Sequence, residues 1–247
     1  MDRLLYIAMT GAGQVSKAQA VNSNNLANAS TNGFRADLDA FRSLPVDGPG
    51  HKSRAYAVAE GQGVDFTQGT LNATGNPLDV ALKGQGWIAV QAADGSEAYT
   101  RAGNLQINEL GQLLTGAGSP VIGSDGGPIA LPPFEKIDIG DDGTISIRAQ
   151  GQSASTVANV NRIKLVNPDP GSMFKGQDGL MRAEEGIEVV PDAKVTLAGG
   201  VLESSNVNPV ESLVNMISLA RQFEMHIKVM STAQENDAAT ATLMRIS

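Results

Sequence analysis

Residues 208–245 read NPVESLVNMISLARQFEMHIKVMSTAQENDAATATLMR and carry the longest helical pattern of the chain. Asn208 can cap a helix here, and Pro209 fits the first turn, where its missing N–H needs no partner. The pattern predicts a helix from Pro209 to about Arg245, roughly three times the usual length of ~11–12 residues. A helix of this length needs a long partner along its side.

Two interleaved series with a seven-residue spacing run along this predicted helix. One series consists of Leu213, Ala220, Ile227, Gln234 and Ala241, and the other of Met216, Phe223, Met230, Asp237 and Met244. Eight of these ten positions are apolar, which is typical of a coiled-coil face. An ordinary amphipathic helix on a globular core gives a similar pattern, so both interpretations stay open at this point.

A second helix is predicted at the N-terminal end, over residues 4–29, and it can supply the long partner. Its apolar positions follow a similar spacing, with Gln19 and Asn22 as interruptions: Leu5, Ala8, Ala12, Val15, Leu26 and Ala29. Neither helix is expected to be stable alone, since Gly11 and Gly13 weaken the first and the second has an Ala-rich face. We therefore expect both ends of the chain to become ordered on assembly.

Asparagine is unusually frequent where the first predicted helix ends. The residues concerned are Asn22, Asn24, Asn25, Asn28 and Asn32. Asparagine is a poor helix former, so a solvated, fraying helix end stopped by Asn32-Gly33 is one interpretation. The interpretation that we favour is that Asn22, Asn25 and Asn28 form hydrogen bonds across helix interfaces, where a buried asparagine fixes the register.

Glycine separates the two ends of the chain from its middle. Of the 28 glycines, 26 lie from Gly33 to Gly200 and none follows. Short alternating segments separated by turns predict two hairpins in this middle part, one around Asp94-Gly95 and one around Asp141-Asp142-Gly143. Further strands are predicted within residues 78–83, 162–166, 187–190 and 194–197. No long helical period interrupts them, which favours an antiparallel all-β domain.

The predicted fold class is therefore α+β, with three parts. Residues 1–35 and 205–247 form one discontinuous helical assembly domain, in which the two long helices pair like a coiled coil. Residues 36–70, rich in Pro and Gly from Leu44 to Gly63, form a linker or extended arm. Residues 71–204 form the inserted β-rich outer domain.

Composition and motifs argue against several functions. The net charge of −8 speaks against a nucleic-acid-binding surface, and the absence of cysteine excludes disulfides and thiolate metal sites. No run of apolar residues approaches the ~18 of a membrane span, and Leu4–Met9 is too short for a cleaved secretion signal. Asp138–Gly143 lacks the ligands of an EF-hand loop at its third and twelfth positions and is predicted to be a hairpin turn. We expect no enzyme activity, cofactor, metal site or small-molecule substrate.

Four ordered stretches resemble the bacterial flagellar rod and hook proteins. The first is residues 24–35, NNLANASTNGFR, and the second is residues 68–87, from Gln68-Gly69-Thr70-Leu71 to Gly84-Gln85-Gly86-Trp87. The third is residues 99–104, YTRAGN, and the fourth is residues 203–211, ESSNVNPVE, with the helix after it. Residues 1–6 and 220–225 are most similar to the proximal-rod members of the family.

The resemblance implies a structural subunit of the flagellar basal-body rod. Such a subunit polymerises into the helical tube that transmits torque from motor to hook and encloses the export channel. The implied partners are copies of itself, other flagellar rod subunits and the flagellar type III export apparatus. The implied location is the rod within the periplasm, reached without a cleaved signal. A distal-rod or hook-type subunit is the alternative within the family, and a secreted β-domain binding module or adhesin is the alternative of another class.

Assembly residues are expected on both terminal helices. The candidates are Leu5, Ala12, Val15, Asn22, Asn25, Leu26, Asn28, Leu213, Met216, Ala220, Phe223, Ile227, Met230 and Met244. Leu213, Met216, Phe223, Ile227 and Met230 are expected in a seam within the subunit or with its nearest neighbour. The three asparagines are expected in polar contacts between subunits.

Overall fold

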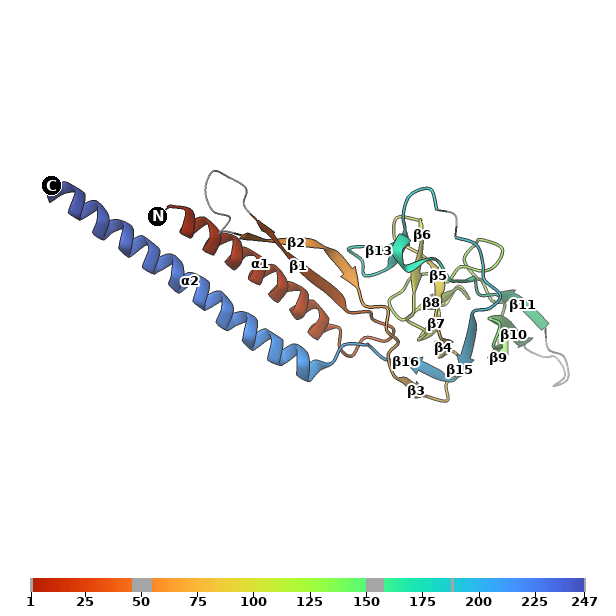
Figure 1. Cartoon of the computed structure of the whole chain (residues 1–247). Helices are drawn as coiled ribbons and strands as arrows, with labels where there is room; N and C mark the ends of the chain where they lie inside the picture. The colour runs from red at the N-terminus through yellow and green to blue at the C-terminus, as the bar shows by residue number, and fades with distance from the viewer. Residues whose placement is uncertain (1, 46–54, 150–157, 188, 247) are drawn as a thin grey trace. The chain divides into compact units, whose positions relative to one another are not determined.

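The computed structural model of the chain describes residues 2–45, 55–149, 158–187 and 189–246. These residues form an α+β structure with one long helix at each end and antiparallel sheets between them (Figure 1). The contacts divide the chain into two compact units. Unit 1 holds residues 1–29, 36–65 and 207–247, and unit 2 holds residues 30–35 and 66–206. The α+β class predicted from the sequence is therefore confirmed.

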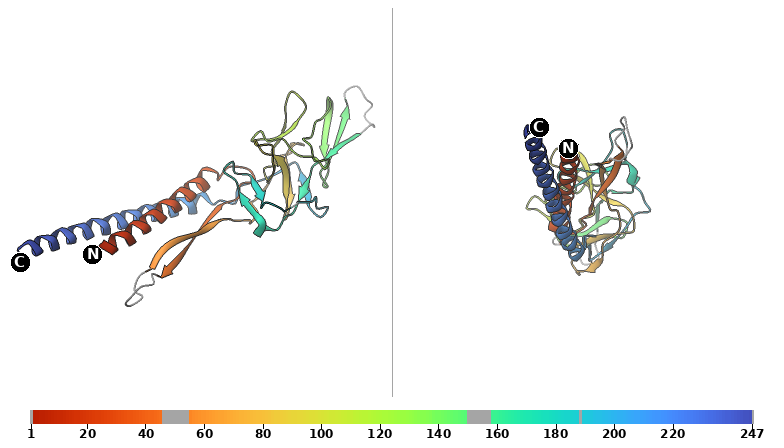
Figure 2. Two further views of the ribbon diagram at one scale, coloured as in Figure 1. Left: turned by 90° about the horizontal axis from the view of Figure 1, so that it is seen from above. Right: turned by 60° about the vertical axis from the view of Figure 1, so that its left-hand side comes forward.

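Unit 1 consists of two helices and one hairpin. Its elements are α1 (Asp2–Ala27), β1 (Asp37–Pro45), β2 (Ala55–Val64) and α2 (Pro209–Ile246). Helix α1 packs against α2 and also against both strands of the hairpin. In Figure 1 it lies between α2 and the hairpin, and Figure 2 gives two further views of the helix pair. Gly11 of α1 faces His226 of α2 and Asn22 faces Ser212, so the two helices run antiparallel.

Helix α2 begins where the sequence predicted. The Asn208 Oδ1 accepts a hydrogen bond from the backbone N–H of Val210 at 3.1 Å, which satisfies one of the free donors of the first turn. The helix then continues without interruption for 38 residues, and Figure 1 shows it as the longest element of the chain.

The hairpin of unit 1 was not predicted from the sequence. Where a linker or extended arm was expected over residues 36–70, β1 and β2 pair antiparallel, from Asp37 opposite Val64 to Pro45 opposite Ala55. The register shifts once, between Asp39 and Phe41. This pairing was not predicted, because the glycines and prolines of the stretch are typical of turns and linkers.

Unit 2 is built from short antiparallel strands. They are β3 (Leu71–Ala73), β4 (Val80–Lys83), β5 (Trp87–Gln91), β6 (Glu97–Thr100), β7 (Leu105–Ile107), β8 (Leu113–Thr115), β9 (Phe134–Ile139), β10 (Thr144–Ala149), β11 (Ala158–Arg162), β12 (Leu165–Val166), β13 (Met173–Lys175), β14 (Met181–Ala183), β15 (Thr196–Gly199) and β16 (Val201–Glu203). A 3-10 turn, η1 (Pro170–Ser172), precedes β13.

The largest sheet of unit 2 has the strand order β12-β5-β6-β14-β13, and a second sheet has the order β11-β10-β9. The two hairpins predicted around Asp94-Gly95 and Asp141-Asp142-Gly143 are confirmed as β5–β6 and β9–β10. In β10, Ile145 and Ile147 enter the core while Thr144 and Ser146 alternate with them, as the period of a strand requires. The strand predicted over residues 187–190 is wrong for the residues that the structure describes there, which lie outside any strand.

The last strands of unit 2 pair with its first strands. Strand β15 pairs with β4, and β16 pairs with β3, so residues 196–203 lie beside residues 71–83. Both pairings join segments more than a hundred positions apart in the sequence. The last strands before α2 therefore complete the sheets that the first strands begin.

Candidate assembly surface

Helix α1 faces α2 with small side chains. Ala8, Ala12, Val15 and Ala18 are all buried, and Gly11 lies on the same side. Small residues let two helix backbones approach closely, so the larger side chains of α2 can fill the space between them. Two of the candidates expected from the sequence, Ala12 and Val15, are thus buried within the chain, while Leu5 and Leu26 are half-buried.

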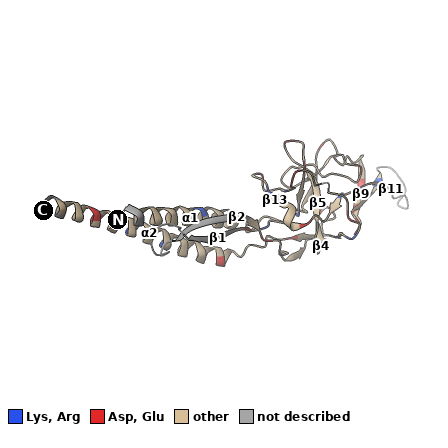
Figure 3. Ribbon diagram, turned by 45° about the horizontal axis from the view of Figure 1, so that its top comes forward, with Lys and Arg blue, Asp and Glu red and all other residues tan. Residues whose placement is uncertain are grey.

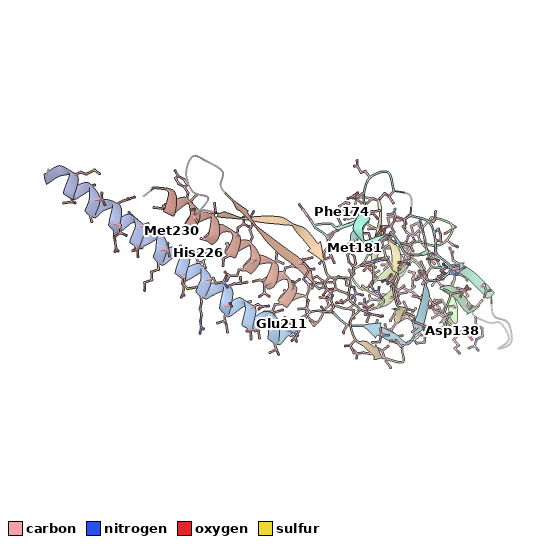
Figure 4. The ribbon with its side chains drawn as sticks, in the orientation of Figure 1. Asp138, Phe174, Met181, Glu211, His226 and Met230 are labelled. Atoms are coloured by element: carbon pink, nitrogen blue, oxygen red, sulfur yellow. The ribbon has the colours of Figure 1, made fainter. Side chains whose placement is uncertain are left out.

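The face that α2 turns inward follows one of the two predicted series and is displaced by one residue from the other. Its buried and half-buried positions include the following, at steps of three, four or seven residues: Ser212, Met216, Leu219, His226, Met230 and Ala233. In Figure 4 His226 and Met230 lie on the side of α2 toward α1. Met216 and Met230 belong to the expected seam, but Leu213 and Ile227 do not, since they are 49% and 45% exposed.

The remaining candidates on α2 lie at or outside the edge of this inner face. Ala220 is half-buried, Phe223 is 36% exposed and Met244 is 74% exposed. The predicted series from Leu213 is more apolar than the series that contains Ser212 and His226. The structure buries the less apolar series, because apolar residues occur on more than one side of α2.

A second apolar stripe runs along the opposite side of α2, near its N-terminal end. Its residues follow the spacing i, i+3, i+4 and i+7, and all are exposed: Val210, Leu213, Val214 and Ile217. Side chains at this spacing lie on one face of a helix. A helix that is apolar on two opposite faces is stable only when both faces are covered. Within the described part of unit 1, only the inner face is covered.

Further along α2 the outer side becomes polar. Arg221, Glu224, Lys228 and Glu235 follow one another there at helical spacing, and all are exposed. Figure 3 shows how sparse charged residues are on the rest of the two helices. On the flank of the same part of α2, Met225 and Val229 line a shallow pocket with Lys228 and Ala233. The outer apolar stripe is therefore confined to the first turns of α2.

The three asparagines expected in contacts between subunits have partners within the chain. Asn22 Nδ2 donates to the backbone oxygen of Ser212 at 2.8 Å, which is a hydrogen bond across the α1–α2 interface. Asn25 forms two hydrogen bonds with the backbone of Asp37 in β1, donating to its oxygen at 2.9 Å and accepting from its N–H at 2.8 Å. Asn28 Nδ2 donates to the backbone oxygen of Asn24 at 3.0 Å, at the end of α1. Asn22 and Asn25 thus position α1 against α2 and the hairpin.

A buried ion cluster in unit 2 was missed by sequence analysis. Glu203, at the end of β16, is fully buried and contacts two arginines. Its Oε2 accepts from Arg101 Nε at 2.8 Å, and its Oε1 accepts from Arg35 Nη2 and from the backbone N–H of Gly69 at 2.9 Å. Burial lowers the pKa of the Arg101 guanidinium, and the Glu203 carboxylate opposes this effect.

The stretches that carry the family resemblance meet in this cluster. Gly33 to Arg35, Gly69, Gly84 to Trp87, Arg101 and Glu203 each come from one of the four stretches. Arg101 also donates to the backbone oxygens of Gly86 at 3.1 Å and Gly84 at 2.7 Å, and its guanidinium carbon lies 5.9 Å from the centre of the Trp87 ring. The four motifs could have suggested that their residues lie close together in the fold. Because the motifs are far apart in the sequence, they do not indicate which side chains form ion pairs.

The described residues form neither a metal site nor a membrane-spanning helix. There is no group of three or more His, Asp or Glu side chains placed to hold a metal ion. Neither of the described helices is both long and apolar enough to cross a membrane.

Protein-family models match three parts of the chain. The model described as "Flagella basal body rod protein" matches residues 5–35, and "Flagellar hook protein FlgE/F/G D1 domain" matches residues 81–147. "Flagellar basal body rod FlgEFG protein C-terminal" matches residues 198–243. The first and third matches cover most of α1 and α2, which are the helices that carry the candidate assembly surface.

Similar curated proteins extend over the whole chain. The flagellar basal-body rod protein FlgF of Salmonella typhimurium is 47% identical, and that of Escherichia coli is 46% identical, with all of both chains covered in each case. The flagellar basal-body rod protein FlgG of Buchnera aphidicola subsp. Schizaphis graminum is 33% identical, over 94% of this chain and 95% of its own.

Proposed function

This chain belongs to the FlgF family of flagellar basal-body rod proteins and is a structural subunit of the rod, and we propose that it works by burying the outer face of α2 against neighbouring subunits. The polymer formed in this way is a helical tube that transmits torque from motor to hook and encloses the export channel. In this proposal the helices of unit 1 make the contacts between subunits, and residues 71–204 form an outer domain.

One observation carries the proposal. Helix α2 has an inner apolar face against α1 and an outer apolar stripe formed by Val210, Leu213, Val214 and Ile217, all of which are exposed in the single chain. Contiguous exposed apolar side chains of this kind mark a surface that another protein covers. Leu213 and Ile227 were expected in a seam either within the subunit or with its nearest neighbour. Because both are exposed in the single chain, they support the second possibility.

Two alternatives were left open by the sequence. Identity to FlgF proteins reaches 47%, compared with 33% for the FlgG protein reported above, which favours the proximal-rod over the distal-rod or hook-type subunit. Relatives that match the whole chain are named as rod proteins, which favours a rod subunit over a secreted binding module or adhesin.

Partners and location follow from the same premise. The chain assembles with other rod components, and we propose direct contact with copies of itself and passage through the flagellar type III export apparatus. We also propose that the subunit reaches the periplasmic part of the rod without a cleaved signal. The expected ordering of the terminal helices on assembly stays a prediction.

Substitution of the outer stripe tests the proposal. Ile217→Asp places a charge at the last position of the stripe, whereas Ser231→Asp places one on an exposed polar position of the same helix. In a strain that lacks the chromosomal copy, the unaltered chain and Ser231→Asp are expected to restore swimming, and Ile217→Asp is not. Circular dichroism of the purified proteins should show the same helix content for all three. Normal swimming with Ile217→Asp would reject the outer stripe as an assembly contact.

A further inference from the structure

The chain passes between the two units four times. The passages lie near Ala29, near Arg35, near Asp65 and near Asn206. Three segments of unit 2 adjoin them: residues 30–35, the start of the stretch at Phe66, and the end of the stretch at Asn206. Any force exchanged between the units along the backbone has to enter unit 2 through these three segments.

All three segments are joined to Glu203. The Glu203 carboxylate binds Arg35 from the first segment and the backbone N–H of Gly69 from the second. The backbone oxygen of Glu203 accepts from the N–H of Gly33 at 2.8 Å, and Glu203 itself belongs to the third segment. Arg101 then ties the carboxylate to the core of unit 2, next to Trp87.

Hydrogen bonds around the cluster join the same segments to one another. The N–H of Asn206 donates to the backbone oxygen of Phe34 at 3.3 Å, and its Nδ2 donates to the backbone oxygen of Thr67 at 3.2 Å. The N–H of Ser204 donates to the backbone oxygen of Thr70 at 2.9 Å. The third segment is thus linked to each of the other two by hydrogen bonds besides those of the Glu203 carboxylate.

The space around Gly33 is equally constrained. Gly33 has a φ of +68°, and a Cβ at this position would lie 2.3 Å from the backbone carbon of Arg101. The first segment therefore runs in direct contact with the segment that supplies Arg101. Only glycine combines this backbone conformation with so close an approach.

A buried ion cluster is a poor choice for stability alone. Two guanidiniums share one carboxylate, and Arg35 Nε and Nη1 are buried without a hydrogen-bond partner in the described structure. Well-packed apolar residues often stabilise a protein as well as a buried ion pair does. Charged hydrogen bonds additionally fix the orientation of each chain segment that they hold.

We propose that the Glu203 cluster is a mechanical junction, which makes the chain segments adjoining all four passages between the units carry load together. The proposal rests on the function as a rod subunit, because only a protein that transmits force has a use for such a junction. Without the cluster, residues 30–35, which belong to no strand, would be held only by their remaining hydrogen bonds, and β3 and β16 mainly by their pairing with each other.

Amide hydrogen exchange on the full-length chain tests the junction directly. Glu203→Gln keeps the shape of the side chain and removes its charge, and Glu135→Gln is the matched control, because Glu135 pairs with Arg148 at 3.2 Å in a partly exposed position. In Glu203→Gln we expect the amides of Gly33, Gly69 and Ser204 to exchange at least about tenfold faster. The amides of Ala89 and Val121, which donate within the core of unit 2, are expected to keep their rates.

Two results would overturn the junction. One is an equal acceleration at all five amides, which would make Glu203 a residue of global stability only. The other is no acceleration at any of them. If Glu203→Gln does not fold, Asn206→Ala decides, because it removes the bond to Thr67 without touching a buried charge. Faster exchange confined to Gly69 and Ser204 would support the junction, and uniform or absent change would reject it.

Swimming at raised viscosity distinguishes the junction from the function as a rod subunit on which it rests. In a strain that lacks the chromosomal copy, we expect Asn206→Ala and Glu203→Gln to swim at low viscosity and to fail at a viscosity where Glu135→Gln still swims. If both variants match Glu135→Gln at every viscosity, the junction is rejected while the rod function stands. If the unaltered chain itself does not restore swimming, the rod function is rejected.

Discussion

The imidazole of His226 occupies the space that a side chain at Gly11 would need. A Cβ at Gly11 would lie 2.5 Å from Cε1 of His226 and 3.0 Å from both ring nitrogens. The absence of a side chain on α1 is therefore matched by a large ring on α2, and the pair sets how far the two helices can slide past each other. Asn22 and Ser212 hold the same interface by a hydrogen bond nearer the start of α2.

Gly11→Ala is expected to destabilise the helix pair, although alanine is the better helix former. The added methyl group has to displace the His226 ring, which costs about 1–3 kcal/mol in a packed interface. Gly13→Ala is the matched control, since a Cβ there meets no atom within 4 Å, and it is expected to stabilise α1 by up to about 1 kcal/mol. Thermal unfolding measures both changes. The double variant Gly11→Ala with His226→Ala should recover part of the loss, and a stabilising Gly11→Ala would contradict the fit.

Asn25→Ala is expected to loosen the hairpin from α1. The change removes both hydrogen bonds to the backbone of Asp37 and leaves its N–H and oxygen without these partners, at a cost of about 1–3 kcal/mol. Asn24→Ala, an exposed position one residue earlier, should change stability by less than about 0.5 kcal/mol. Amide exchange of Asp37 provides the local readout. Equal exchange in the two variants would show that Asn25 does not anchor β1.

Acid is expected to weaken the β13–β14 hairpin through Asp178. A hydrogen bond from Arg182, at 2.8 Å, is the main reason why the pKa of Asp178 lies below its ordinary value of 3.8. A carboxyl whose pKa is lower in the folded state stabilises the fold above its unfolded pKa, and this contribution is lost as the pH falls through the lowered value. The loss should therefore begin near pH 4 and grow as the pH falls further, with a small amplitude because Asp178 is 37% exposed.

The variant Asp178→Asn isolates that contribution. It should unfold at a lower temperature than the unaltered chain at pH 7, and the difference should shrink as the pH is lowered below about 4. A constant difference at all pH values would mean that the ion pair does not couple to folding.

Local signals in the sequence predicted much of the fold. Asn208-Pro209 marked the start of α2, and Asp94-Gly95 marked the turn of the β5–β6 hairpin, because caps and tight turns depend on residues close together in the chain. The β1–β2 hairpin was missed, since its Pro and Gly residues resemble a linker. One of the two predicted series on α2 was displaced by one residue, because Leu213 and Ser212 are neighbours and only the partner helix decides which of them is buried.

Features that depend on distant residues could not be predicted. Asn22 and Asn25 were expected to bond across interfaces, but their partners, Ser212 and Asp37, lie 190 and 12 residues away and within the same chain. The pairing of Glu203 with Arg35 spans 168 residues, and no local pattern indicates it. The role of the candidate residues in contacts between subunits stays a prediction, which Ile217→Asp addresses.

The position of Glu203 also orders the folding of unit 2 in time. Its partners Arg35, Gly69 and Arg101 precede it by 168, 134 and 102 residues, and β15 and β16, just before it, supply the pairing for β4 and β3. A growing chain therefore carries two strands with open edges until about four fifths of it have been synthesised. Contacts of such sequence separation form slowly, since a long loop must close before any of them is made. The β unit thus stays incomplete for nearly the whole time that the ribosome needs to make it.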